Sequence, residues 1–170
     1  MELYLPEASG RLRYNPPGAK RHTLILEVSG DWIRYARWLT RGVTPRRWTS
    51  VQDPDFNIGG KTRHDPKPGL VGGDLLRPDW GCHITIIRGE RLRANEADWG
   101  RWERGEDITF AFDLNPWYNA KHLWFDVECG YLETIREHYG LRPFRNTPHL
   151  QAGTWCSSTP DVGNHRQKFR

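Results

Sequence analysis

Two short stretches of the sequence each carry a hydrogen-bond donor two residues after a histidine. His83 is followed by Thr85 in the string CHITIIR, and His149 is followed by Gln151 in the string PHLQA. Because side chains alternate along a strand, each histidine points to the same face as its donor. If both strands face one cleft, one imidazole can accept a proton and the other can donate one during phosphodiester cleavage. This acid–base scheme requires no metal ion.

The alternative for either motif alone is a structural histidine that is hydrogen-bonded at the surface of a sheet. A single His-x-Thr string is a weak functional signal. The two motifs share more than residue types, because Gly81 and Pro148 break the chain just before them and a helix is predicted in each half. We therefore interpret the motifs as one catalytic set, in which Thr85 and Gln151 donate hydrogen bonds to the phosphoryl oxygens.

The two motifs resemble those of the 2H phosphoesterases, a family named for two His-x-Thr/Ser motifs in a bilobal α+β fold. The string WGCHITIIRGE, from Trp80 to Glu90, is similar to a phage-encoded branch described both as RNA-repair-like proteins and as anti-CBASS nucleases. The resemblance runs from roughly Gly10 to Trp155, apart from a loop rich in Gly and Pro. It implies two mainly antiparallel sheets with flanking helices around a central cleft.

The resemblance further implies a metal-independent phosphodiesterase without a cofactor. The phage branch implies cleavage of 3′–5′ bonds in cyclic di- or oligonucleotide signals, with a neighbouring ribose 2′-hydroxyl as nucleophile, in the cytoplasm of an infected bacterium. The sequence leaves open which of His83 and His149 is the base and which is the acid. One position departs from the family pattern, since Gln151 stands where Thr or Ser is expected and donates from a longer side chain.

Two other functions stay open from the sequence. The first is an RNA-end enzyme that opens 2′,3′-cyclic phosphates or acts on 2′–5′ linkages. The second is a non-catalytic binding module, in which the change at Gln151 marks a protein that sequesters a nucleotide without cleaving it.

Aromatic side chains near a nucleotide cleft can stack on a base. Tyr14, ahead of the first predicted strand, and Trp80, just before the first motif, are the substrate-binding candidates. Arg88 is a candidate for phosphate contact, but alternation along a regular strand places it on the face opposite His83. A structural ion pair is therefore an equal interpretation of Arg88.

Two further histidines are not assigned to the catalytic set. His122 lies on a predicted strand without a hydroxyl or amide two places on, and its face also carries Asp126 and Glu128. We interpret that face as a solvated or ion-paired surface, and expect loss of His122 to leave most activity. His64 is expected to be a solvated loop residue.

The elements that must position these residues follow from apolar patterns. Strands are predicted over 22–29, 82–88, 106–113, 122–129 and 148–156, and helices over 32–42 and 131–139, with a short helix within 93–105. An irregular loop, rich in Gly and Pro, covers 42–81. Strands and helices are mixed without strict alternation, so we expect an α+β, mainly antiparallel fold.

Composition limits the function classes. The chain has 170 residues, which suits one bilobal domain over 1–156 followed by a polar tail over 157–170. Its net charge of +4 suits an anionic ligand but is too small to predict duplex DNA binding. The three cysteines predict neither a disulfide framework nor a zinc site. No apolar run approaches the roughly 20 residues that a membrane-spanning helix needs, and no signal peptide is apparent. We therefore expect a cytoplasmic protein that is not in a membrane, and the sequence leaves its oligomeric state unknown.

Overall fold

The strands and helices predicted from apolar patterns are present close to their expected bounds. The computed structural model describes residues 5–42, 46–47, 75–119 and 122–155. The helices are α1 (Trp32–Gly42), α2 (Gly130–His138) and a 3-10 turn, η3 (Glu96–Asp98). The strands are β1 (Glu7–Tyr14), β2 (Thr23–Val28), β3 (Arg46–Arg47), β4 (Leu75–Leu76), β5 (His83–Arg88), β6 (Asp107–Phe112), β7 (Trp117–Tyr118), β8 (His122–Glu128) and β9 (His149–Trp155).

The sheet is largely antiparallel, which confirms the α+β prediction. Its nine strands follow the order β3-β7-β8-β6-β1-β2-β5-β9-β4, and β8 also pairs with β9. Since β8 is hydrogen-bonded to both β6 and β9, the pairings of β8, β6, β1, β2, β5 and β9 run in a closed circuit. We expected two sheets, whereas the described strands belong to one continuous sheet.

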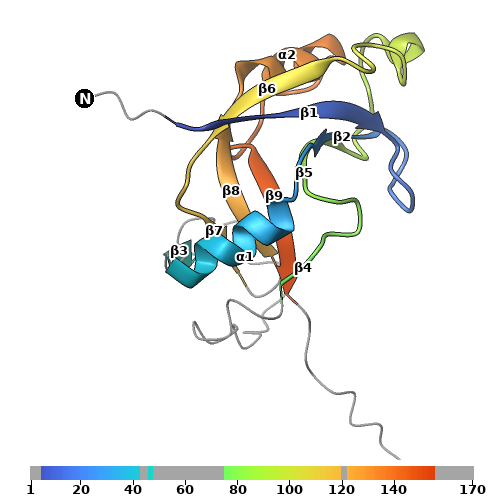
Figure 1. Cartoon of the computed structure of the whole chain (residues 1–170). Coiled ribbons are helices and arrows are strands. Elements are labelled where there is room, and N and C mark those ends of the chain that lie inside the picture. Colours follow the sequence, from blue (N-terminus) through green and yellow to red (C-terminus); the bar gives the residue numbers. More distant parts are fainter. Residues whose placement is uncertain (1–4, 43–45, 48–74, 120–121, 156–170) are drawn as a thin grey trace, which may run out of the picture.

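One face of this sheet forms the core together with both helices. Leu24 and Leu26 of β2 pack there with Ile84 of β5 and Leu150 of β9. Trp32 enters from α1, with its ring centroid 4.9 Å from that of Phe112. Figure 1 shows α1 and α2 toward opposite ends of the long strands β8 and β9. The other face of β5 and β9 is therefore left for polar side chains.

Local signals explain where the helices begin and end. The backbone N–H of Arg34 donates to the Asp31 carboxylate at 3.2 Å, so Asp31 caps the N-terminus of α1. After α2, Gly140 adopts a positive φ of 66°. Its backbone N–H donates to the carbonyl of Glu137. Glycine suits such a left-handed position because it has no Cβ.

Some short and polar strands were missed. β1 carries Arg11 and Arg13 on one face and only Leu12 as a buried aliphatic residue, so its sequence lacks a strong strand pattern. β4 lies inside the segment predicted as an irregular loop and pairs with β9. Most of that loop, His64 and the tail over 157–170 lie outside the described residues. The short helix predicted within 93–105 is reduced to η3 and turns.

Candidate functional site

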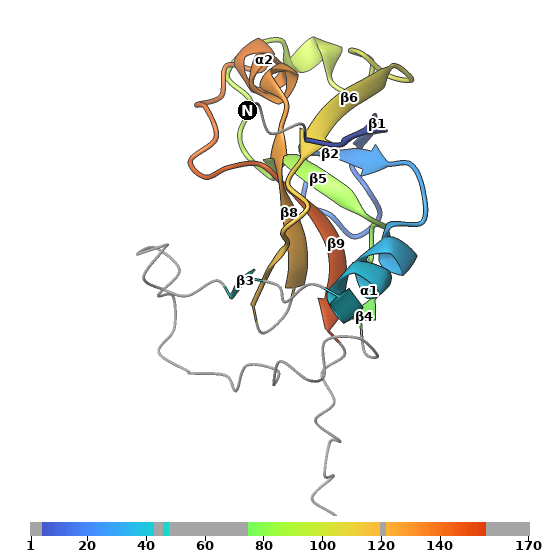
Figure 2. The ribbon, with the colours of Figure 1, turned by 60° about the vertical axis from the view of Figure 1, so that its left-hand side comes forward.

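The two histidine motifs lie on adjacent antiparallel strands and share one face of the sheet. His83 of β5 is directly opposite Gln151 of β9, and Ile84 is opposite Leu150. Ile84 and Leu150 are fully buried in the core, so His83 and Gln151 project from the other face. The recorded pairing ends at Ile84 and Leu150, and Thr85 and His149 are the next residues on the two strands, on the same face as His83 and Gln151. Figure 2 shows β5 and β9 side by side, with β8 on the other side of β9.

The outer strands add a carboxylate beside each imidazole. Glu27 of β2 is opposite His83, and Asp126 of β8 is opposite His149. His83 therefore lies between Glu27 on one side and Gln151, the donor residue of the other motif, on the other side. His149 lies between Asp126 and the strand β5, which carries Thr85. This local twofold pattern follows from the antiparallel pairing of β5 with β9.

His83 is held as a buried, neutral imidazole. Its residue is only 4% exposed, and its Nδ1 lies 2.7 Å from the carbonyl oxygen of Gly81. A carbonyl can only accept, so Nδ1–H donates and Nε2 keeps its lone pair. Burial lowers the pKa of His83, and Arg88 lowers it further, while the Gly81 carbonyl and Glu27 oppose the shift. A neutral ring with a free Nε2 lone pair can act as a proton acceptor.

His149 has the same local support in a more open place. Its ring is hydrogen-bonded to the backbone of Thr147, two residues earlier, as His83 is to Gly81. Surrounding protein lowers the pKa of His149, and Asp126 and the Thr147 backbone offset part of that shift. Since the residue is exposed to solvent, water screens this effect more than at His83. The charge of His83 also lowers the pKa of His149, so the two rings are electrostatically coupled.

A cavity of about 480 Å³ opens beside the second motif. Of the four residues predicted as catalytic, His149 and Gln151 line it, while His83 and Thr85 do not. The other lining residues are polar, charged or aromatic: Arg88, Asn119, His122, Trp124, Asp126, Arg145, Asn146 and Thr147. The cavity is therefore suited to a polar ligand with an anionic group and a flat ring.

Arg88 lies on the histidine face, contrary to the prediction from strict alternation. The β2–β5 register shifts between Leu24 and Ile25, so that β5 holds one extra residue there. Ile86 and Ile87 are consequently both buried, and the alternation is reversed beyond them. Arg88 thus turns into the cavity that His149 lines. A bulge of this kind leaves no clear trace in the sequence.

His122 also lines this site, whereas we expected its face to be a solvated or ion-paired surface apart from the two motifs. Nδ1 of His122 lies 3.0 Å from Nε2 of Gln151, so the amide N–H donates to the imidazole. His122 and Asp126 line the cavity because β8 pairs with β9 on this side. Asp126 in turn accepts a hydrogen bond of 2.8 Å from Nε1 of Trp117.

The two aromatic candidates for substrate binding lie in different parts of the structure. Tyr14 is directly opposite the core residue Leu24, and its hydroxyl donates to the Trp102 carbonyl at 2.6 Å. The structure therefore places Tyr14 in packing on the core face, away from the histidines, so its assignment to substrate binding was wrong. Trp80 lies beside the first motif, with its ring centroid 5.5 Å from that of His83. Its Nε1–H donates to the Pro17 carbonyl at 2.9 Å.

The chain matches no protein-family model, no curated protein and no solved structure.

Several site residues were not identified from the sequence. Arg145, Asn146 and Thr147 lie in the connection between α2 and β9, and Asn119 follows β7. No periodic pattern marks such loop residues. Asp126 could have been found, since it alternates with Trp124 on the strand that carries His122.

Two kinds of feature are absent from the described part of the chain: clusters of metal-ligating side chains and long apolar helices. Within it, no three or more His, Cys, Asp or Glu side chains gather as a metal site would need. None of its helices combines the length and apolar character needed to span a membrane. Cys82 and Cys129 are free thiols, and burial raises the pKa of Cys82 to about 11. Cys82 is therefore a core residue rather than a nucleophile.

Proposed function

We propose that the chain is a phosphodiesterase in which His83 and His149 act as general base and general acid. The observation that carries this proposal is the pairing of His83 with Gln151, which gathers both motifs on one face of the sheet. The carboxylates of Glu27 and Asp126, one beside each imidazole, extend the same pattern. A histidine with a purely structural role at a sheet surface would need neither a carboxylate on the neighbouring strand nor a second histidine motif beside it.

The two roles follow from the two environments. His83 is buried, with a lowered pKa and Nε2 unprotonated, so we assign it as the base. The surrounding protein lowers the pKa of His149 as well, but this residue is exposed, and the Asp126 carboxylate opposite offsets part of the shift in favour of the protonated ring, so we assign His149 as the acid. His83 takes the proton of the attacking hydroxyl as the new P–O bond forms. His149 then protonates the leaving oxygen as the old P–O bond breaks.

The negative charge that develops on the non-bridging phosphoryl oxygens needs hydrogen-bond donors and cations nearby. Thr85 is on the same face as His83, and Arg88 is brought to that face by the bulge in β5. We assign both to the non-bridging oxygens. In the structure the Gln151 amide donates to His122, so the amide can donate to a phosphate only after its hydrogen bond to His122 breaks.

A substrate can reach the buried His83 only if a neighbouring side chain moves. The residue is 4% exposed, and Trp80 packs against its ring. Rotation of Trp80 would open Nε2 and leave an indole face for a nucleobase, so Trp80 keeps its proposed place in substrate binding.

For the substrate we propose a cyclic di- or oligonucleotide with 3′–5′ bonds, cleaved within a bilobal fold of the 2H phosphoesterase type. The local twofold pattern of the two motifs supports this fold. RNA-end processing at 2′,3′-cyclic phosphates or 2′–5′ linkages uses the same acid–base pair and is the second candidate. The test is turnover in EDTA of cyclic dinucleotides, cyclic trinucleotides and cyclic-phosphate RNA ends. Cleavage of the RNA ends alone would overturn the first choice.

A non-catalytic nucleotide-binding role is favoured by one observation. The Gln151 amide is already held by His122, so the second donor is turned toward a side chain. Nucleotide recovered intact after tight binding to the protein would support sequestration. Turnover of any diester in the same panel, lost in His83→Ala, would exclude it.

A further inference from the structure

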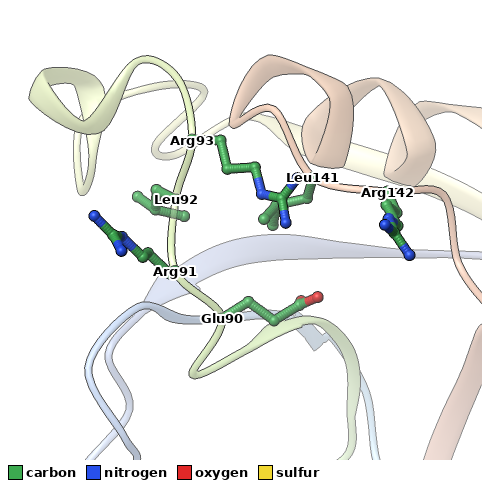
Figure 3. A pocket seen from close by; sticks show the side chains of 6 residues that line it. All are labelled: Glu90, Arg91, Leu92, Arg93, Leu141 and Arg142. Atoms are coloured by element: carbon green, nitrogen blue, oxygen red, sulfur yellow. The ribbon is translucent and has the colours of Figure 1, made fainter.

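A second, larger cavity lies next to the histidine site. It has a volume of about 730 Å³ and lies between the segment that follows β5 and the segment that follows α2. Its lining consists of Glu90, Arg91, Leu92, Arg93, Leu141 and Arg142. Figure 3 shows Arg93 reaching from its own segment toward Leu141, with Arg142 beyond it. Arg91 turns to the opposite side of its segment.

The charge of this cavity is positive because its one acid is already neutralised. Both carboxylate oxygens of Glu90 accept hydrogen bonds from the Arg136 guanidinium, at 2.8 and 2.9 Å. Arg136 is buried, and it also donates to the carbonyls of Ile86 and Arg142. Across the described ranges, Arg93 and Arg142 pair with no carboxylate, and both are exposed. The cavity therefore presents uncompensated guanidinium groups to solvent.

The local backbone holds Arg93 in place. The backbone N–H groups of Arg93 and Ala94 both donate to the Tyr139 carbonyl at the end of α2. Gly140 permits this close approach, since a Cβ there would lie 3.0 Å from the Arg93 Cβ. Leu92 is buried and Leu141 half-buried, so an apolar surface lies among the arginines. Guanidinium groups bind phosphate through charge-assisted and often bidentate hydrogen bonds, so the arginines of this cavity suit a phosphate group.

The same two segments lead directly into the histidine site. Arg88 lines the first cavity and Glu90, two residues on, lines the second. Likewise Arg142 lines the second cavity and Arg145, three residues on, lines the first. Two or three residues of extended chain span at most about 11 Å. The two cavities are thus neighbours along both segments, and each is lined by arginines.

We infer that this second cavity binds a further phosphate of a single-stranded nucleotide chain whose scissile phosphate lies at His83 and His149. The inference rests on the proposed phosphodiesterase function and narrows its substrate to an oligonucleotide, cyclic or linear, in preference to a cyclic dinucleotide. The substrate extends beyond one phosphodiester, along Arg88, Arg93 and Arg142. A chain of several nucleotides fits this surface better than a mononucleotide does.

The test is equilibrium binding of fluorescein-labelled 2′-O-methyl RNA, which lacks the nucleophilic hydroxyl and stays intact. Anisotropy is measured with a dimer and a hexamer between about 50 and 200 mM salt. We expect the hexamer to bind more tightly than the dimer. Arg93→Gln and Arg142→Gln should each flatten the salt dependence of hexamer affinity by about 0.7 in log–log slope, the value for one phosphate contact with a single strand.

The control is Arg34→Gln, which removes the same charge from α1 at the other end of the strands. Its salt slope should equal that of the unaltered protein. Equal hexamer affinity in the control and in the Arg93→Gln/Arg142→Gln variant would overturn the inference. So would equal affinity for heparin and for the hexamer, since that would indicate a general polyanion surface.

Failure of the inference and failure of the proposed function give different results. If the protein cleaves nucleotide diesters but the arginine variants bind the hexamer normally, only the second site is wrong. If the variants lose hexamer binding but no diester is cleaved, phosphate binding in the second cavity is supported and the phosphodiesterase proposal is wrong.

Discussion

His83 on β5 lies directly opposite Gln151 on β9, so the histidine of the first motif faces the donor residue of the second. The Gln151 amide is bound to a third histidine, His122, at 3.0 Å. This chain of contacts ties β5, β9 and β8 together on one face. Mutations of these residues can therefore distinguish the loss of proton transfer from the loss of support for the Gln151 amide.

Loss of either imidazole should remove most activity. We expect His83→Ala and His149→Ala each to lower kcat/KM for a nucleotide diester by about 100-fold or more, because each removes a proton-transfer group. His138→Gln is the matched control, since this histidine stacks on Trp102 in another part of the molecule. Near-full activity in either alanine variant would exclude the two-imidazole mechanism.

The pH dependence should report the environment of His83. Since burial lowers its pKa, the acidic limb of kcat/KM should lie below the ordinary histidine value of 6.5. Glu27 raises this pKa, so Glu27→Gln should move the limb to lower pH. Arg88 lowers it, so Arg88→Gln should move the limb to higher pH. A limb that stays in place in both variants would contradict the assignment of His83 as the base.

The role of the second donor can be tested at Gln151. Gln151→Thr restores the residue type typical of the motif and frees the His122 ring from the amide, so we expect kcat to rise. His122→Ala should leave most activity, because proton transfer does not pass through His122. A loss in His122→Ala equal to that in His149→Ala would show that excluding His122 from the catalytic set was wrong.

Arg88 should contribute to transition-state stabilisation. Arg88→Gln removes a cation from the histidine face, and we expect kcat to fall by about 100-fold, the usual effect of losing one charge-stabilising donor. Arg88→Lys keeps the positive charge but not the bidentate hydrogen bonding of a guanidinium, and should retain part of the kcat that Arg88→Gln loses. An unchanged kcat in Arg88→Gln would show that the bulge in β5 serves packing alone.

The ion pair between Glu90 and Arg136 should support stability. Glu90→Ala leaves the buried Arg136 without its carboxylate, and we expect the free energy of unfolding to fall by about 3 kcal/mol. Because Arg136 lowers the pKa of Glu90, the pair's contribution is present above the ordinary value of 4.5 and is lost as pH falls through the lower folded value. Urea unfolding at several pH values measures both effects. The exposed pair of Arg11 with Asp107 is the control, where Asp107→Ala should change the free energy of unfolding far less, because water screens the pair.

Most of the secondary structure could be predicted from the sequence because its signals are local. Alternating or continuous apolar residues mark β2, β5, β6, β8 and β9, and the Asp31 cap and Gly140 mark helix ends. The His-x-donor spacing likewise predicts that each motif projects to one face. These statements depend only on residues a few positions apart, which share a face whatever their strand pairs with.

Strand pairing and its irregularities were decided only in three dimensions. Which strand lies beside β5, the extra residue that turns Arg88 to the histidine face, and the contact of His122 with Gln151 all depend on residues far apart in the chain. The separation of Tyr14 from the site has the same origin, because its neighbours are set by pairing with β2. Sequence determined the chemical groups and their local direction, whereas tertiary packing determined which groups meet. The reason is that a one-residue change in register or a single bulge reverses the face of every side chain beyond it.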